Sequence, residues 1–362
     1  MADNKDKKVL NVPHLRFPEF TEEWKRKRFK DVCNITTGNK NTQDKSDDGI
    51  YPFYVRSQIV ERINSWTFDG EAILTAGDGV GVGKVFHYST GKIGVHQRVY
   101  ILSDFKCDGK YLYSYFAGNF YNRVKRMSAK NSVDSVRMEM IADMPISLPS
   151  NEEQKKIGHL LALLDERIAT QNKIIEKLQS LIKGLRVRLI QIENGNIVHL
   201  GEIAQIYQPQ TISSTELTED GFLVYGANGI IGKYKEYNHK TEQICITCRG
   251  NTCGMVNYTK PMSWITGNAM VINTDAHQDK VCKRYLYHYL SAYNFNRIIS
   301  GSGQPQIVRT PLEQLKVTLP TISEQKQKAL FLDKIQDKID LNHKVLNLYI
   351  RQKQYLLRQM FI

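Results

Sequence analysis

Long hydrophobic runs are missing from this sequence. No apolar stretch approaches the roughly 20 residues that a helix needs to cross a bilayer. The first ten residues, MADNKDKKVL, also lack the apolar segment of a secretory signal peptide. From these two observations we expect a soluble, cytoplasmic protein.

Cysteine is sparse, with six residues spread unevenly along the chain, so a disulfide framework is not expected. Cys245 lies in the strand-like run ICIT and forms a single C-x-x-C with Cys248, which follows that run. No second C-x-x-C or histidine pair completes four zinc ligands. We interpret the cysteines as ordinary reduced thiols and expect no metal in this chain.

Catalytic signatures are missing as well. The run GDGVGVGK at residues 77–84 fails the phosphate-loop pattern, because Asp78 stands where glycine is required and Val85 follows Lys84. The sequence has no Asn-Pro-Pro-aromatic tetrad of adenine methylation, no H-E-x-x-H and no G-x-S-x-G. We therefore predict a protein without an active site of its own.

Acidic residues are outnumbered: 50 Lys and Arg face 37 Asp and Glu, which leaves a formal charge of +13. Such a balance favours a polyanionic partner, with nucleic acid first and an anionic membrane surface second. The lack of a spanning segment weakens the membrane alternative.

An internal repeat is the most informative feature of the 362 residues. LPSNEEQKKIGHLL, which begins at Leu148, recurs as LPTISEQKQKALFL, which begins at Leu319. With the same shift, Gly79 and Gly83 correspond to Gly250 and Gly254. KYLYSYFAGNFYNRV at 110–124 likewise resembles RYLYHYLSAYNFNRI at 284–298. The chain thus holds two copies of a unit, each a globular region followed by a helix.

Both helices carry the same start signal. Ser150 and Thr321 follow a Leu-Pro pair, and Glu153 and Glu324 stand three residues later, which is the spacing of a reciprocal capping box. Apolar residues then recur at alternating steps of three and four, as in a coiled-coil seam. In the first helix the seam is Ile157, Leu161, Leu164, Ile168, Gln171, Ile175, Leu178, Ile182, Leu185, Leu189 and Ile192.

The second helix keeps this register less regularly, and Lys353 interrupts it. Its seam is Leu332, Ile335, Ile339, Asn342, Leu346, Tyr349, Leu356 and Met360. Two amphipathic helices packed separately on their own domains are the simpler alternative. A helix over 150–193 would, however, extend about 60 Å, well beyond the face of a small domain. We expect the helices to pair with each other.

The globular regions are expected to be mixed. YPFYV, RVYIL, FLVYG and MVIN are strand-like runs, whereas the two Tyr-rich segments have helical apolar spacing. We predict an α+β fold of two domains and two long helices that form an antiparallel coiled coil. The predicted bounds are 1–149 for the first domain, 150–193 for the first helix, 194–320 for the second domain and 321–362 for the second helix.

Two divergent domains, each followed by a helix that L-P-[ST]-x-x-E-Q opens, resemble the specificity subunit of type I restriction-modification systems. LRFPEFTEEWKRKRFKDV from Leu15 and SGSGQPQI from Ser300 add to the resemblance, which covers almost the whole chain. The first copy departs from it, with MSAKNSVDSVRM in place of SGSGQPQIVRT.

The resemblance implies that each domain is a target recognition domain for one half of a split double-stranded DNA site. It also implies that the helices dock two methyltransferase subunits, alongside motor-nuclease subunits of the restriction complex. S-adenosylmethionine, ATP and Mg²⁺ would then belong to those partners, and this non-catalytic chain would need no cofactor.

Direct reading of bases calls for Arg and Lys against guanine, Asn and Gln against adenine, and further cations against phosphates. Candidates in the first domain are Arg56, Gln58, Lys84, Gln97, Arg98, Lys130 and Asn131. In the second domain they are Asn228, Arg249, Asn251, Asn268, Gln304, Gln306 and Arg309. At equivalent positions Asp78 becomes Arg249, Lys84 becomes Met255 and Arg98 becomes Ala269, so we expect the two half-sites to differ.

Other interpretations remain open at this point. The basic run KRKRFK from Lys25 fits a phosphate clamp or a solvated face equally well. A non-enzymatic coiled-coil adaptor that binds acidic proteins would share the charge and the helices. Sequence-selective binding to duplex DNA separates that adaptor from a specificity subunit.

Overall fold

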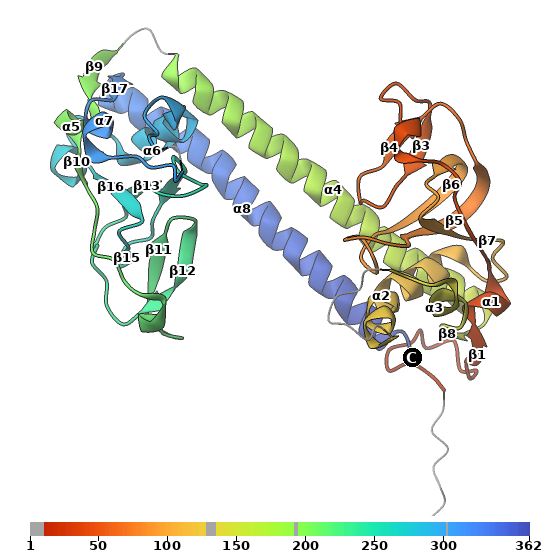
Figure 1. Ribbon diagram of the computed structural model, residues 1–362. Coiled ribbons are helices and arrows are strands. Elements are labelled where there is room, and N and C mark those ends of the chain that lie inside the picture. Colours follow the sequence, from red (N-terminus) through yellow and green to blue (C-terminus); the bar gives the residue numbers. More distant parts are fainter. Residues whose placement is uncertain (1–10, 128–134, 192–194, 302) are drawn as a thin grey trace, which may run out of the picture. The chain divides into compact units, whose positions relative to one another are not determined.

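The computed structural model describes residues 11–127, 135–191, 195–301 and 303–362, and its fold is α+β. Contacts divide the chain into two units (Figure 1). Unit 1 comprises Met1–Gln171 and Val345–Ile362, and unit 2 comprises Asn172–Lys344. Each unit therefore holds one globular region and parts of both long helices.

Unit 1 is built on a six-stranded sheet of order β2-β7-β5-β6-β3-β4. Its remaining strands, β1 and β8, pair antiparallel with each other. The elements are β1 (Lys25–Arg28), α1 (Phe29–Val32), β2 (Asn34–Thr37), η1 (Thr42–Asp44), β3 (Tyr51–Tyr54), β4 (Glu61–Ile63), β5 (Phe68–Ala76), β6 (Phe86–Val95), β7 (Val99–Ser103), α2 (Gly109–Met127), α3 (Met138–Ala142) and β8 (Pro145–Leu148).

Unit 2 has a four-stranded sheet of order β10-β16-β13-β14, a three-stranded sheet of order β12-β11-β15, and the pair β17-β9. Its elements are β9 (Asn196–His199), α5 (Leu200–Ile203), β10 (Gln205–Tyr207), η2 (Ser214–Glu216), β11 (Phe222–Gly226), β12 (Gly229–Tyr234), β13 (Ile244–Thr247), β14 (Val256–Tyr258), β15 (Trp264–Ile265), β16 (Ala269–Asn273), η3 (Asp275–His277), α6 (Lys283–Ala292), η4 (Phe295–Arg297), α7 (Arg309–Glu313) and β17 (Lys316–Leu319).

The strand pairings show that the sequence repeat is a structural repeat. Lys25 pairs with Leu148 in unit 1, and the equivalent residues Asn196 and Leu319 pair in unit 2. The main difference is β6, whose counterpart in unit 2 is split into β14 and β15. Pro261 lies in the gap between them, and proline interrupts a strand because it has no N–H for the ladder. One continuous sheet in unit 1 thus becomes two sheets in unit 2.

A tyrosine-rich helix covers the core of each unit. In unit 1, Tyr111 and Phe116 of α2 are fully buried in a core with strand residues such as Ile73. In unit 2, Tyr285 of α6 is fully buried in a core that includes Ile244. The helical spacing of large apolar residues predicted both helices. The spacing arises because one face of each helix packs in the core with strand residues.

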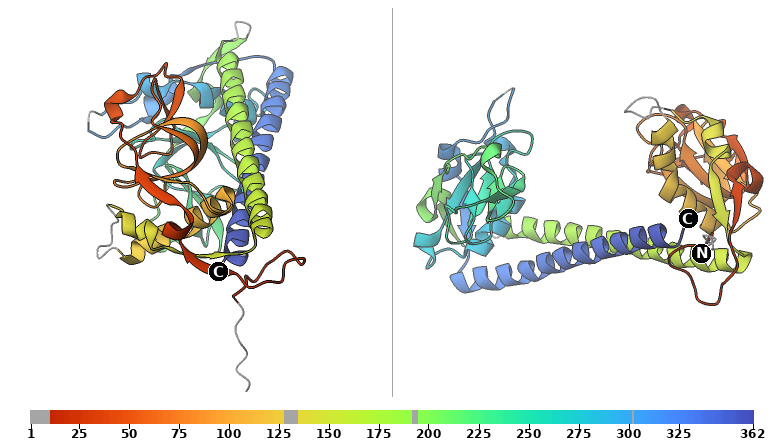
Figure 2. Two further views of the ribbon diagram at one scale, coloured as in Figure 1. Left: turned by 90° about the vertical axis from the view of Figure 1, so that its right-hand side faces the viewer. Right: turned by 90° about the horizontal axis from the view of Figure 1, so that it is seen from below.

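The long helices are α4 (Asn151–Ile190) and α8 (Ile322–Gln359), and each is continuous in every view (Figure 2). Within unit 1 they run antiparallel: Asp165 of α4 binds Lys353 of α8, and two residues later Arg167 lies over the ring of Tyr349. Within unit 2, Arg186 of α4 donates to Gln336 of α8 at 3.3 Å. Lys353, which interrupts the apolar seam, is therefore an ion-pair partner.

The predicted seam residues face inward. All those described in α4 are buried or half-buried, and Ile192 lies outside the described residues. Leu332 and Ile339 of α8 are buried in the core of unit 2, whereas Met360 follows the end of α8 and is buried in the core of unit 1. In the described part of the chain, no helix is both long enough and apolar enough to span a membrane.

The two helix starts use their capping residues differently. In α8 the box is reciprocal: Glu324 N donates to Thr321 Oγ1 at 3.4 Å, and Thr321 N donates to Glu324 Oε2 at 3.0 Å. In α4, Glu153 N donates to Ser150 Oγ at 3.4 Å, but the fully buried Glu153 carboxylate binds Arg16 at 2.7 and 2.8 Å. The expected return bond in α4 is thus replaced, because a buried carboxylate needs a cation more than an amide.

The last residue of the repeated motif, Gln154 or Gln325, fixes each long helix to its globular region. Gln154 accepts from Asp108 N at 3.0 Å and donates to Pro149 O at 2.9 Å. Gln325 accepts from Cys282 N at 2.8 Å and donates to Pro320 O at 2.9 Å and Lys280 O at 3.1 Å. Both glutamine side chains are buried, so each amide forms its hydrogen bonds with backbone groups of the protein.

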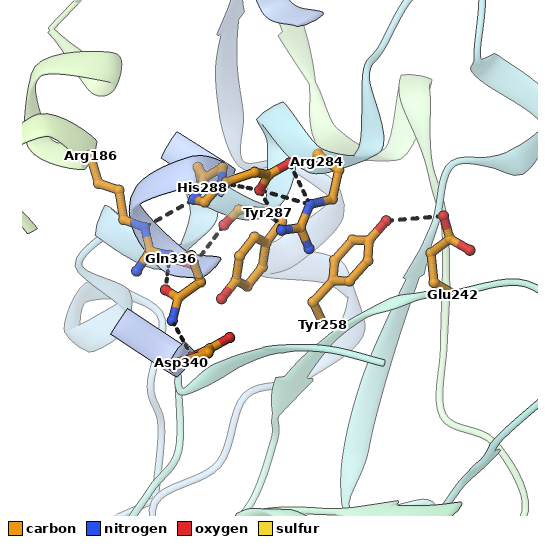
Figure 3. Close-up of polar contacts among 10 residues, drawn as sticks. Arg186, Glu242, Tyr258, Arg284, Tyr287, His288, Gln336 and Asp340 are labelled. Atoms are coloured by element: carbon orange, nitrogen blue, oxygen red, sulfur yellow. Dashed lines mark hydrogen bonds and ion pairs between the residues drawn. The ribbon is translucent and has the colours of Figure 1, made fainter. Parts of the chain in front are cut away.

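A polar cluster joins α4, α6 and α8 inside unit 2 (Figure 3). The single N–H of Arg284 Nε is shared between the two carboxylate oxygens of Asp333, at 2.9 and 3.0 Å, and Asp333 Oδ1 lies 2.8 Å from His288 Nε2. Arg186 Nε donates to His288 Nδ1 at 3.0 Å, so Nδ1 is unprotonated and Nε2 carries the hydrogen. The Arg284 guanidinium also lies 4.3 Å from the ring centre of Tyr258.

This arrangement makes the stability of unit 2 depend on pH. Burial lowers the pKa of His288, and the nearby Arg186 lowers it further, against the hydrogen bond with Asp333 that raises it. A folded-state pKa below the unfolded value of about 6.5 gives stability that is complete above that pH and is lost as pH falls. Burial lowers the pKa of His239 in the same unit as well.

We therefore expect the urea midpoint of unit 2 to fall between pH 7.5 and pH 5.5, and His288→Gln to reduce that fall. The fall in the urea midpoint that remains in the variant is expected to come from His239. Equal pH dependence in wild type and variant would contradict a neutral, buried His288.

Candidate nucleic-acid interface

In unit 1, five of the seven residues predicted to contact DNA lie on or beside four segments that meet. They are the end of β3, the loop that joins β5 to β6, the turn between β6 and β7, and the segment before α3. Gly77 N donates to Arg98 O at 2.8 Å, and Val136 N donates to Gly77 O at 2.7 Å. Asp78 also forms a β-bridge with Ser135. Backbone hydrogen bonds thus fix the β5–β6 loop from both sides.

Asp78 gathers two of the predicted arginines on this surface. Its Oδ1 accepts from Arg56 Nη1 at 2.8 Å, and its Oδ2 binds Arg98 Nη1. The carboxylate is 20% exposed, whereas the Arg56 and Arg98 side chains are 44% and 60% exposed. One sheltered carboxylate therefore holds two guanidinium groups at the surface.

The charges of this cluster are mutually supported. Burial raises the pKa of Asp78, but the hydrogen bonds from Arg98 and Arg56 outweigh burial and hold it below its usual value. Burial lowers the pKa of His96, and the positive charge of Arg56 lowers it further. The neutral His96 accepts from Arg98 N through Nδ1 at 3.0 Å. His96 thereby fixes the backbone from which Arg98 projects.

The other candidates of unit 1 are exposed around this cluster. Gln97 Nε2 donates to Asn41 Oδ1 at 2.7 Å, and the Lys84 ammonium lies 5.8 Å from the ring centre of Tyr121. Gln58 is exposed in the loop after β3. Lys130 and Asn131 lie outside the described residues, so their predicted roles stay predictions.

Unit 2 builds the equivalent surface from equivalent segments. Arg249 forms a β-bridge with Gln306, as Asp78 does with Ser135, and Ile307 N donates to Cys248 O at 3.0 Å. The departure between MSAKNSVDSVRM and SGSGQPQIVRT therefore leaves the bridge in place. Gly301 has φ +93°, and a Cβ there would lie 2.4 Å from Gln304 O, which explains the glycine of that turn.

Amide side chains dominate this second surface. Asn228 accepts a hydrogen bond from Thr252, the residue that follows Asn251. Asn268 is exposed in the turn before β16. Gln304 and Gln306 are exposed in the turn before α7. Arg309, at the start of α7, donates to Glu313 at 2.7 Å and is thus paired within its own helix.

Sequence reasoning missed two residues of these surfaces. Asp78 was predicted to differ in charge from its equivalent Arg249, but not to bind Arg56 and Arg98. Val80 at the tip of the β5–β6 loop is 99% exposed, and Asn251 is its equivalent. Val80 is apolar and was not among the candidates, which are all polar residues, yet an apolar side chain can contact the methyl group of thymine.

The basic run KRKRFK forms β1 and the start of α1. Arg28 and Lys30 bind the same oxygen of Asp143, at 3.1 and 2.8 Å. All three side chains are more than a third exposed, so these contacts are weak and do not exclude a phosphate partner. The phosphate clamp and the solvated face both stay predictions.

The glycine-rich run and the C-x-x-C differ in local structure from a phosphate loop and from a metal site. The glycine-rich run 77–84 joins two antiparallel strands and opens no helix, so it lacks the helix N-terminus of a phosphate loop. Burial raises the pKa of Cys245, so that thiol stays protonated. Among the residues that the structure describes, no cluster of His, Cys, Asp or Glu is arranged to hold a metal ion.

Comparison with known proteins gives a consistent result. The family model described as type I restriction modification DNA specificity domain matches residues 21–180 and again 193–348. The type I restriction enzyme EcoDI specificity subunit of Escherichia coli is 28% identical over 164 residues, which are 45% of this chain and 36% of that protein. The match thus spans about a third of that relative's length.

Two further similarities extend over nearly the whole chain. The type I restriction enzyme MjaVIII specificity subunit of Methanocaldococcus jannaschii is 24% identical, with coverage of 94% of this chain and 92% of the relative. The crystal structure of a type I restriction-modification system S subunit from M. genitalium aligns with a TM-score of 0.76 at 18% identity, over 97% and 99% of the two chains. At that identity the structural likeness establishes a shared fold.

Proposed function

We propose, because this chain belongs to the type I restriction modification DNA specificity family, that it is the DNA-recognition subunit of a restriction-modification complex. In this proposal each unit reads one half of a split double-stranded site. The chain itself catalyses nothing, and its partners carry out methylation and cleavage.

One observation carries the proposal: the two units share a loop framework but expose different side chains on it. The bridge of Asp78 to Ser135 recurs as the bridge of Arg249 to Gln306. At equivalent positions of the two loops, Asp78 of unit 1 corresponds to Arg249 of unit 2, and Val80 corresponds to Asn251. A fixed backbone with exchanged hydrogen-bonding groups is what reading two different base sequences requires.

The charge and the helices support the partners that we propose. A formal charge of +13 favours the approach of a DNA polyanion. Because α4 and α8 are equivalent parts of a repeat, two copies of one methyltransferase subunit would find similar docking surfaces. Motor-nuclease subunits would complete the complex. S-adenosylmethionine, ATP and Mg²⁺ would bind to these partners.

Mapping methylated adenines tests this function directly. In cells that carry the chain with its methyltransferase partner, we expect methylation at a bipartite motif whose two halves differ. Exchanging residues 15–149 for the first domain of a related protein should change one half-site and leave the other intact. A palindromic motif, or changes in both halves, would contradict separate recognition by two units.

Binding to short duplexes distinguishes this proposal from an adaptor for acidic proteins. A specificity subunit in complex with its methyltransferase should prefer a duplex with the mapped motif over scrambled duplexes by at least about 10³-fold. An adaptor would bind all these duplexes with equal, purely salt-dependent affinity.

A further inference from the structure

We propose that Arg98 reads a guanine in the half-site of unit 1 and that Asp78 is the positioning residue that aims it. This inference rests on the proposed function and adds the base class and the residue that recognises it. It starts from an unusual feature of the surface: a carboxylate stands at the centre of a face that is expected to bind a polyanion.

The geometry fixes Arg98 at both ends. At the backbone, Arg98 N donates to the buried His96 Nδ1 at 3.0 Å, and Arg98 O accepts from Gly77 N at 2.8 Å. At the side chain, Nη1 binds Asp78 Oδ2. Arg56 occupies the other carboxylate oxygen at 2.8 Å, which stops Asp78 from rotating away. Arg98 thus loses little side-chain freedom when it binds a ligand.

Enough of the guanidinium remains for a base. Arginine has several N–H donors in a planar fork, and the contact with Asp78 engages only Nη1. The Arg98 side chain is 60% exposed, the most exposed member of the cluster. A planar pair of donors matches the O6 and N7 acceptors of guanine, the commonest specific contact of arginine in the major groove.

Asp78 favours a base edge over a phosphate. Two guanidinium groups and one carboxylate carry a net charge of +1, and a phosphate at this place would face the carboxylate charge. The guanine edge carries no formal charge, so it meets the donors of Arg98 without that repulsion. The Asp78 carboxylate thus weakens non-specific attraction to DNA while it orients the Arg98 side chain toward a base.

Unit 2 lacks this device and serves as an internal control. The equivalents of Asp78 and Arg98 are Arg249 and Ala269, so the carboxylate and the reader are both missing there. The half-site of unit 2 should therefore be unaffected by any change in the Asp78 cluster.

The test uses the full chain in complex with its methyltransferase partner, with binding to duplexes substituted at each position of the mapped motif. Arg98→Ala should lose discrimination at one G·C pair, by about 10- to 100-fold, and keep discrimination at every other position of the motif. Asp78→Asn should relax the same G·C pair and, because it removes a negative charge, bind scrambled duplexes more tightly with a steeper salt slope.

Asp78→Asn is thus expected to weaken discrimination at one G·C pair and to strengthen binding to scrambled duplexes. A merely structural role of Asp78 would instead weaken binding to all duplexes. Asp143→Asn is the matched control, because Asp143 also joins two cations of unit 1, Arg28 and Lys30. It should leave discrimination at every motif position unchanged.

Several results would overturn the inference while leaving the proposed function intact. One is a wild-type bipartite motif in which the position sensitive to Arg98→Ala is not a G·C pair. Another is a uniform loss of affinity with a shallower salt slope in Arg98→Ala, which identifies a phosphate contact. If the wild-type complex has no preferred duplex at all, the proposed function fails, and this inference fails with it.

Discussion

Gln325→Leu is expected to lower the free energy of unfolding of unit 2 by about 2–4 kcal/mol. The side chain is 1% exposed and makes three hydrogen bonds, to Cys282 N, Pro320 O and Lys280 O. Leucine fills a similar volume but removes the partner of all three backbone groups, and the hydrogen bond to Pro320 O is a buried one. The measurement is the urea midpoint of unit 2, followed by a probe placed in that unit.

Two comparisons make this result specific. Gln179→Leu, on the exposed face of α4 in the same unit, should change the midpoint little. Gln154→Leu in unit 1 should cost less than Gln325→Leu, because Gln154 makes two such bonds. If Gln325→Leu costs no more than Gln179→Leu, the glutamine of the repeated motif does not anchor the helix.

These glutamines mark the limit of what the repeat alone predicts. The start of each long helix follows from local signals, because Leu-Pro, the capping residue and the acidic residue lie within one turn. The partners of Gln325, by contrast, include Cys282 N, which lies 43 positions away and meets it only through the packing of α6 on α8. Likewise, the sequence does not predict that Glu153 binds Arg16 instead of its own capping residue.

The recognition surface shows the same division. Repeat equivalence identified the loop at Asp78 and its counterpart at Arg249, because glycines preserve the register on both sides. The bridge between Asp78 and Ser135 was not predictable, since it depends on how the segment before α3 folds back onto the sheet. Polar residue type alone therefore found Arg56 and Arg98 but not the carboxylate that holds them.

The Asp78 cluster also links base recognition to the framework beneath it. Arg98 stands on a backbone fixed by the buried His96, and the loop of Asp78 is held by hydrogen bonds to the β6–β7 turn and to the segment before α3. A reader on a rigid frame gains specificity because a wrong base cannot be accommodated by a shift of the loop. Exchange of a few side chains on one frame can then produce new half-sites.

Matched insertion of seven residues in both long helices is expected to lengthen the DNA spacer and leave both half-sites unchanged. We place the insertions after Gln171 in α4 and after Lys344 in α8, where the contacts divide the chain into its units. Each unit then keeps its own α4–α8 contacts, such as Asp165 with Lys353 and Arg186 with Gln336. Seven helical residues add about 10 Å, or roughly three base pairs.

The control for the matched insertion is a seven-residue insertion in α4 alone. The α4–α8 contacts of unit 1 and those of unit 2 then call for different lengths of the two helices, so one set must break. We expect the single insertion to abolish methylation at the motif and to lower the stability of the chain, whereas the matched pair remains active. Methylated sites are mapped for wild type and both variants. If the single insertion keeps the original motif and spacer, the helices act as a flexible tether, because only a tether absorbs a change in one helix without moving the half-sites.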